Sequence, residues 1–289
     1  MNASFITMGG RRPRRPATGT PNEQAITMSA AQEKIDRVIR TLNHEEADRV
    51  PVGEFFWTNF VRRCKREMDV GEDFDPYRHW DLDMVVLTAN MDPHLTGIEV
   101  LEDNERRKLV KTGFGATIER RSTLPMPHFA EFAYESWDAV EALEFDDPYD
   151  PRRYHEQLDD QINSVGDELN LGLPAWIERV DDYARDMCVF GGTCEPHELV
   201  WRIMGSENVL MKMGEDPDRF GRIIGRLGDF GAAIADAQIK AAGGKLSGMY
   251  VWGDIAYVNG MMFNPKYWNE VYKPQLRKIT DVIHGHGLK

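Results

Sequence analysis

Short apolar runs that end in a polar residue recur along the chain and alternate with longer amphipathic stretches. We predict that these runs form buried β-strands at 48–54, 83–90, 187–193 and 246–252. The almost continuous apolar character of 83–90 is typical of a parallel sheet that is covered on both faces. Strands that alternate with helices indicate βαβ units, so the pattern predicts an α/β fold.

The amphipathic stretches predict the helices between these strands. Ile35, Val38, Ile39 and Leu42 have the spacing of one helix face, behind a possible cap at Ser29. We expect further helices at 136–143, 151–168, 195–213 and 217–242, and after Asn264–Pro265. Residues 98–123 alternate apolar and polar positions around Gly113–Gly115, which predicts an antiparallel β-hairpin inserted between the βαβ units as a lid or wall.

Composition separates the N-terminus from the rest of the chain. Residues 1–28 contain Arg11, Arg12, Arg14 and Arg15 among prolines and few apolar positions. We expect 1–28 to be a disordered basic tail, most simply a solvated extension, although it could also bind an acidic partner or act as an address. Residues 29–289 have enough apolar positions to form one α/β domain.

Charge and cysteine content restrict the class of protein. The net charge is −13, which argues against a nucleic-acid partner because such domains are usually basic. The three cysteines show no paired spacing, so a disulfide framework is not expected. Neither a signal peptide nor an apolar run of about 18 to 20 residues, the length that spans a bilayer, is evident. We therefore expect a cytoplasmic enzyme that does not bind a membrane.

Polar residues at the ends of the predicted strands are the candidate site. No G-x-G-x-x-G sequence follows a strand, so a barrel is favoured over a dinucleotide-binding sheet. Barrel enzymes place their catalytic groups at the carboxyl ends of the strands. We therefore predict Asp254 and Glu54 as catalytic residues. The residues expected to bind substrate are Asn90, Trp57, Glu195, His197, Trp252 and Tyr257.

Several of these residues have a simpler structural interpretation. Asp254 could cap the turn that follows it, and His197 could be a capping or surface residue at the start of a helix. Cys194 is a further candidate near the site, but a buried cysteine is more often a small apolar filler. His284 and His286 have the spacing of a metal pair, yet near a helix end such residues are more often capping residues that suit the helix dipole. The aromatic residues could line a pocket or plug a barrel.

The order of several short segments resembles the uroporphyrinogen decarboxylase superfamily, which also contains cobalamin-linked methyltransferases. These segments are Asp48–Val52, Leu95–Val100, Phe190–Pro196 with Trp201–Gly205, Gly253–Ala256, Asn264–Pro265, Tyr272–Pro274 and His284–Gly287. The resemblance implies a (β/α)8 TIM barrel, of which this chain holds about the first four strands with the hairpin insertion. It also implies that the remaining strands lie beyond Lys289, and the open edges of a half barrel make a homodimer possible.

Departures from the family pattern separate its branches. The decarboxylase is expected to have an arginine-rich loop after its first strand and an aspartate where this chain has Asn90, and neither is present. The acidic residues at the strand ends, Glu54, Glu195 and Asp254, would also repel a substrate with eight carboxylates. The favoured interpretation is therefore a methyltransferase that moves a methyl group from methylcobalamin to a thiol or related acceptor.

The resemblance also implies cofactors and partners. In the methyltransferase branch zinc activates the acceptor, and its ligands are expected beyond Lys289. A corrinoid, free or carried by a protein, would be the co-substrate, and the acceptor would be a small molecule. Two alternatives stay open: decarboxylation of uroporphyrinogen III in porphyrin biosynthesis, and a non-catalytic binding or assembly fragment.

Overall fold

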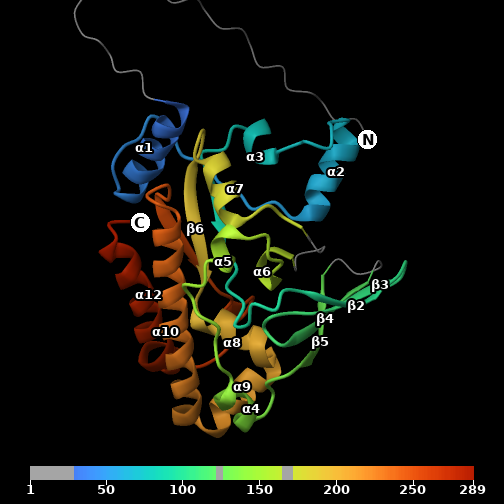
Figure 1. Cartoon of the computed structure of the whole chain (residues 1–289). Helices are drawn as coiled ribbons and strands as arrows, with labels where there is room; N and C mark the ends of the chain where they lie inside the picture. Colours follow the sequence, from blue (N-terminus) through green and yellow to red (C-terminus); the bar gives the residue numbers. More distant parts are fainter. Residues whose placement is uncertain (1–28, 122–125, 165–171) are drawn as a thin grey trace, which may run out of the picture.

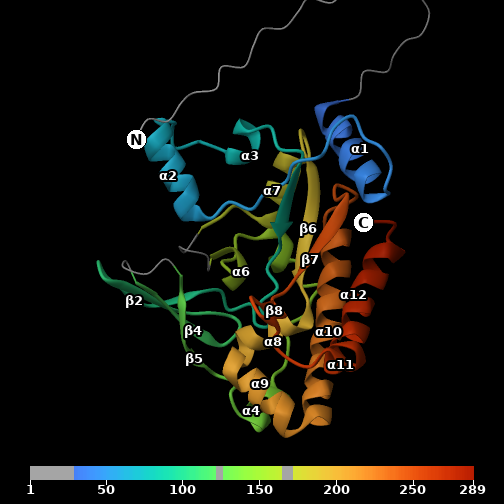
Figure 2. The same ribbon diagram turned by 180° about the vertical axis from the view of Figure 1, so that it is seen from behind.

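Two β-sheets organise the protein, which is described by a computed structural model over residues 29–121, 126–164 and 172–289. The expected tail 1–28 lies outside these residues. Strands β1 (Met84–Thr88), β6 (Cys188–Cys194) and β7 (Gly248–Trp252) form a parallel sheet in the order β1-β6-β7. Figures 1 and 2 show the antiparallel sheet projecting from the side of this layer. Its strands are β2 (Glu99–Asp103), β3 (Arg107–Lys111), β4 (Ala116–Arg121) and β5 (His128–Phe132).

Helices connect and cover the strands, and a short hairpin follows β7. The first helices are α1 (Ala30–Leu42), α2 (Thr58–Met68), α3 (Pro76–His79), α4 (Trp137–Ala142), α5 (Arg152–His155), α6 (Gln161–Ser164) and α7 (Trp176–Tyr183). They are followed by α8 (Pro196–Met204), α9 (Ser206–Glu215), α10 (Pro217–Ala241), α11 (Pro265–Tyr267), the π-helical turn η1 (Trp268–Tyr272) and α12 (Lys273–Gly285). The hairpin consists of β8 (Ala256–Tyr257) and β9 (Gly260–Met261).

The parallel sheet separates two apolar layers, because successive side chains of a strand point to opposite faces. Val85 and Val189 are paired in register and pack in a cluster with residues of α7, α10 and α12. Cys188 and Phe190, on the other face, pack with Val38 of α1. Figure 2 shows α10 and α12 side by side next to the sheet. The first face is therefore covered along the strands, whereas α1 covers the second face only over the first half of β1 and β6, and Tyr250 in the middle of β7 is 43% exposed, so the expected covering of both faces is met on one face alone.

The expected first strand, 48–54, is not formed as a strand. The segment makes one parallel bridge, between Gly53 and Met84. Beside this bridge the carboxylate of Asp83 accepts a hydrogen bond from the N–H of Val52 at 2.7 Å, and the N–H of Asp83 donates to the carbonyl of Val52. The described residues thus form an open parallel sheet of three strands, not four, and no closed barrel.

Three other expectations differ from the structure. The helix expected over 195–213 is divided at Gly205, which adopts a φ of +82° between α8 and α9. The helix expected over 151–168 is replaced by α5 and α6 with a non-helical segment between them, and its last residues lie outside the described part. The predicted hairpin at 98–123 is part of a four-stranded sheet. Among the described helices, none combines the length and apolar character that crossing a membrane requires.

Candidate functional site

The carboxyl ends of β6 and β7 bring two predicted site residues together. Cys194 and Trp252 are paired in the parallel register, and the N–H of Glu195 donates to the carbonyl of Trp252 at 2.8 Å. Glu195 therefore leaves β6 directly beside the point where Gly253 and Asp254 leave β7. The carboxylates that the sequence places 59 positions apart share one edge of the sheet.

Glu195 is held in place by the start of α8. Its carboxylate accepts hydrogen bonds from the backbone N–H groups of His197 and Glu198, both at 2.8 Å. The carboxylate also lies so close to Gly253 that a Cβ on that residue would be 2.2 Å from Oε1, so a larger residue there requires the side chain of Glu195 to shift. Glu195 is 5% exposed, and burial raises its pKa to about 7, with further contributions from the negative charges of Glu198 and Asp254.

Glu198 connects α8 to the loop that carries Asp254. One carboxylate oxygen accepts hydrogen bonds from Trp201 Nε1 at 2.8 Å and from the N–H of Asp254 at 3.2 Å. The other oxygen accepts from the guanidinium of Arg202 at 2.6 Å. This residue was not predicted from the sequence, although a glutamate three positions after a capping residue is a known helix-start signal. Its contacts hold the backbone of Asp254 against the helix.

His197 lies below this edge, in the interior of the protein. It is 3% exposed, and its Nδ1 is 3.0 Å from the hydroxyl of Tyr272. Burial lowers the pKa of His197 to about 4, so the ring is neutral at pH 7. The ring also contacts Phe263, with 5.1 Å between centroids. The structure therefore places His197 where it supports Tyr272, behind the surface that a substrate would reach.

The other residues predicted at strand ends are accessible to solvent. The side chains of Asp254 and Glu54 are exposed, and Glu54 accepts a hydrogen bond from the N–H of Phe55 at 2.8 Å. Trp57 precedes α2 and is half exposed, while Tyr257 in β8 is 57% exposed. Asp254 and Tyr257 thus follow the carboxyl end of β7, whereas Glu54 and Trp57 follow the bridge to Met84 at the start of β1.

Aromatic rings form a row on one face of the sheet, from β7 to the chain after the Gly53 bridge. Tyr250 lies 6.2 Å from Trp252 and 5.3 Å from Phe55, measured between ring centroids. The rings of Tyr250 and Trp252 are close to parallel, with 29° between their planes. Trp252, which was predicted to bind substrate, is therefore one member of a short aromatic row.

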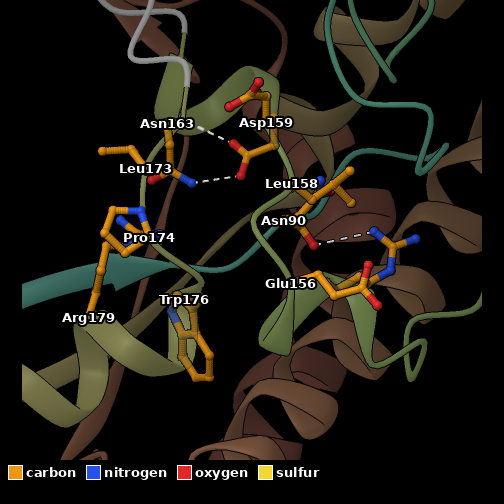
Figure 3. Close-up of a pocket in the computed structure, with 11 residues that line it drawn as sticks. Asn90, Glu156, Leu158, Asp159, Asn163, Leu173, Pro174, Trp176 and Arg179 are labelled. Atoms are coloured by element: carbon orange, nitrogen blue, oxygen red, sulfur yellow. Dashed lines mark hydrogen bonds between the residues drawn. The ribbon is translucent and has the colours of Figure 1, made fainter.

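Asn90 lies in a second part of the site, at the exit of β1. It lines a small cavity together with residues of α5, α7 and the segments beside them (Figure 3). Two charged residues of this cavity, Asp160 and Arg179, were not recognised from the sequence, because their elements are short and contain no motif. The carboxyl group of Asp160 is buried, which raises its pKa to about 6.

The described residues do not form an evident metal centre. No group of three or more His, Cys, Asp or Glu side chains is placed to hold an ion within this part of the chain. Cys194 is fully buried, which raises the pKa of its thiol well above the usual value. His286 contacts Asp236, with 2.6 Å between Nε2 and Oδ1, at the end of α12. The zinc site expected beyond Lys289 stays a prediction.

Comparison with known proteins shows a likeness of fold. No protein-family model matches the sequence, and no curated protein matches it. Among solved structures, a methyltransferase from Methanosarcina mazei aligns with 86% of this chain and 67% of its own length. The TM-score is 0.50 and the sequence identity is 14%. The chain is thus similar in fold to an archaeal methyltransferase.

Proposed function

We propose that this protein is a methyltransferase that moves a methyl group from a methylcorrinoid to a small acceptor bound at the carboxyl edge of the parallel sheet. The observation that carries the proposal is the fold likeness to the methyltransferase from Methanosarcina mazei, which extends over 86% of the chain. The grouping of Glu195, Glu198 and Asp254 at that edge supports it, because catalytic groups of such folds gather at the carboxyl ends of strands.

The acidic cluster suits the proton transfer that methylation of a thiol or a similar acceptor requires. The acceptor forms a bond to the methyl carbon and loses its proton, while the bond between carbon and cobalt breaks and leaves its electron pair on cobalt. Asp254 is the exposed carboxylate that would take the proton. Glu198 acts as a positioning residue, because it binds the N–H of Asp254 and fixes the loop.

The aromatic row gives a surface for the flat macrocycle of the donor. Tyr250 and Trp252 have nearly parallel rings, and Phe55 lies at the other side of Tyr250. Aromatic faces bind planar ligands by offset stacking. The donor would stack on Tyr250 and Trp252, because the ring of Phe55 is tilted by 56° from that of Tyr250.

The described residues bring together no set of three His, Cys, Asp or Glu side chains fitted to an ion, so they do not provide a zinc site by themselves. The roles assigned to Asp254 and Glu198 depend only on groups that the structure describes.

An anaerobic assay tests this proposal. The protein is mixed with methylcob(III)alamin and a series of small thiols, and loss of the methylcorrinoid absorbance is followed with time. The Asp254→Asn variant is expected to lose about 100-fold in rate, the usual contribution of a general base. Asp281→Asn on α12 makes the same charge change at another exposed site and should retain the rate.

The alternatives predict different results in the same preparation. Release of CO2 from uroporphyrinogen III without demethylation of the corrinoid would show a decarboxylase. A protein that is folded yet inactive in both assays would contradict the methyltransferase proposal and favour the binding or assembly role.

A further inference from the structure

The side chain of Trp201 on α8 shares a hydrogen-bond acceptor with the loop that carries Asp254. Its indole Nε1 donates to one carboxylate oxygen of Glu198 at 2.8 Å, and the N–H of Asp254 donates to the same oxygen at 3.2 Å. Glu198 is buried, with 3% of its surface exposed, so water does not readily replace either donor. The position of the Asp254 loop therefore depends on the contacts that fix Glu198.

Two side chains of α8 fix the two oxygens of Glu198 separately. The guanidinium of Arg202 donates to the other oxygen, from Nε at 3.1 Å and from a terminal nitrogen at 2.6 Å. The same guanidinium lies over the indole of Trp201, with 4.7 Å between its central carbon and the ring centroid. Arg202 thus fixes one oxygen, and Trp201 is the side-chain donor that fixes the oxygen facing Asp254.

Strand β5 of the antiparallel sheet packs against the same indole. Phe129 meets Trp201 edge to face, with 5.1 Å between the ring centroids and 74° between the planes, a favourable geometry for aromatic pairs. Phe132, also in β5, lies so close to Gly205 that a Cβ there would be 2.8 Å from its ring. Because Gly205 is the residue at which α8 ends, β5 contacts α8 at two points. Figures 1 and 2 both show β5 next to α8.

These contacts form one path between the antiparallel sheet and the candidate site. It runs from Phe129 to Trp201, from Trp201 to Glu198, and from Glu198 to the N–H of Asp254. The edge-to-face contact restricts rotation of the indole, and the indole N–H points at Glu198 only in that orientation. Loss of the ring at position 129 should therefore loosen the hydrogen bond from Trp201 without removing its donor.

We propose that Trp201 is a positioning residue for Asp254, and that β5 keeps the indole in its orientation through Phe129. The inference deepens the proposed function and rests on it only for the role of Asp254 as the proton acceptor. The antiparallel sheet, which the sequence predicts as a lid or wall, then also supports the Asp254 loop. Displacing β5 would release that loop and slow the proton transfer.

Exchange of the backbone amide proton of Asp254, followed by NMR, tests both steps of the path. Trp201→Phe keeps an aromatic ring against Phe129 and removes the indole donor, so exchange should be about tenfold faster, the effect of weakening one hydrogen bond. Phe129→Leu keeps an apolar side chain and removes the edge-to-face contact, so exchange should rise by a smaller factor. A rise in Trp201→Phe alone would overturn the role of β5. If Trp201→Phe does not fold, Phe129→Leu tests the path from its other end.

A matched aromatic pair away from α8 supplies the controls. Phe74 meets Trp80 with 5.7 Å between the ring centroids and 88° between the planes, a similar edge-to-face geometry. Trp80→Phe and Phe74→Leu make the same chemical changes there and should leave the exchange of Asp254 unchanged. Equally fast exchange in these controls would show that any loss of aromatic packing loosens the protein, which would contradict the path.

The pKa of Glu195 gives a readout that a purely structural role of Trp201 would not move. Burial raises this pKa to about 7, and the negative charges of Glu198 and Asp254 add to the shift. If Trp201→Phe releases the loop, the charge of Asp254 moves away and the pKa of Glu195 falls, as measured by the 13C shift of its carboxyl group against pH. An unchanged pKa together with an unchanged exchange rate would overturn the proposal.

The methyl-transfer assay separates this inference from the proposed function. If both are correct, Trp201→Phe lowers kcat and leaves KM unchanged, because it displaces the base and not the aromatic surface for the donor. Absence of transfer by the wild type, with altered exchange and pKa in Trp201→Phe, would contradict the proposed function and retain the positioning role. Full transfer by Trp201→Phe with unchanged exchange would contradict the positioning role alone.

Discussion

Buried carboxylates at the two ends of the parallel sheet have opposite electrostatic surroundings. Before β1, Asp83 is completely buried and is paired with Arg37 at 2.6 Å and with Arg49 at 2.6 Å. After β6, Glu195 is almost as deeply buried, yet it is held by two backbone N–H groups, and its charged neighbours Glu198 and Asp254 are also acidic. One carboxylate is neutralised by cations and the other is not.

The difference separates a structural group from a group that can exchange a proton. Ion pairs fix Asp83 between α1 and the chain that leads to the Gly53 bridge. At Glu195, burial without a cation raises the pKa to about 7, so both protonation states are accessible near neutral pH. A carboxylate paired with arginines, such as Asp83, stabilises the fold, whereas a buried carboxylate without a cation, such as Glu195, can take up or release a proton.

The largest expected loss of stability follows from removing the carboxylate of Asp83, which lies immediately before β1. Asp83→Ala leaves the buried guanidinium of Arg37 without one partner, and breaking a buried ion pair in this way costs about 3 to 5 kcal/mol. Urea denaturation measures this loss in the free energy of unfolding. Asp229→Ala removes an exposed partner of Lys278 and should cost less than about 1 kcal/mol. Equal losses in the two variants would show that Asp83 has no special structural role.

Lowering the pH should destabilise the protein through protonation of His197, which lies at the start of α8. Its folded pKa of about 4 lies below the usual 6.5, so the unfolded chain binds more protons between these values. The contribution to stability is present above pH 6.5 and is lost as the pH falls toward 4, with a total of roughly 3 kcal/mol. His197→Gln retains a polar partner for Tyr272 and should lack this acid-sensitive part in unfolding curves at pH 7 and 4.5. An unchanged pH dependence in the variant would contradict the buried, neutral state of His197.

Adding a methyl group at position 253, directly after β7, should lower the free energy of unfolding by a smaller amount. In Gly253→Ala the new Cβ would be 2.2 Å from Glu195 Oε1, and relieving such overpacking costs about 1 to 3 kcal/mol. Gly214→Ala, in α9, meets no atom within 4 Å and should be neutral or slightly stabilising. Thermal unfolding of the two variants compares them directly. A stable Gly253→Ala variant would show that the carboxylate of Glu195 can move away.

The smallest expected effect is a change in the pKa of Glu195 itself. Removing the negative charge in Asp254→Asn favours ionisation of Glu195, so its pKa should fall below about 7. The 13C chemical shift of its carboxyl group, followed from pH 4 to 9, gives the value. A wild-type pKa of Glu195 near its usual value of 4.5 would contradict the difference drawn between Glu195 and the ion-paired Asp83.

Much of the local structure was predictable because it depends on neighbouring residues. Strands β1 and β7 lie within the apolar runs predicted at 83–90 and 246–252, and β6 extends one residue beyond the run predicted at 187–193. The cap at Ser29 is confirmed, since its side chain accepts from the N–H of Gln32. The expectation that polar residues follow these strands at one edge also agrees with the positions of Asn90, Glu195 and Asp254.

Contacts between distant segments were not predictable from these patterns. The hydroxyl of Tyr272 meets His197 across 75 positions, and Asn163 binds the end of β1 across a similar separation. The segment 48–54 resembles a strand in its composition, yet it forms one bridge, and the N–H of Val52 binds the carboxylate of Asp83 instead of a backbone carbonyl. The spacing of residues along the sequence does not indicate these contacts.

The sequence by itself determined the alternation of strands and helices, their caps, and the acidic and amide residues that follow β1, β6 and β7. These features depend on side-chain periodicity and on hydrogen bonds within a few positions, which act before any tertiary contact forms. Only the tertiary structure decided which of these polar groups are buried and what they face. Burial and the surrounding charges set the pKa of Glu195, and the packing around Asn90 leaves its Nδ2 donor without a partner among the described residues. Both properties depend on segments that are far apart in the chain, so the local sequence does not determine them.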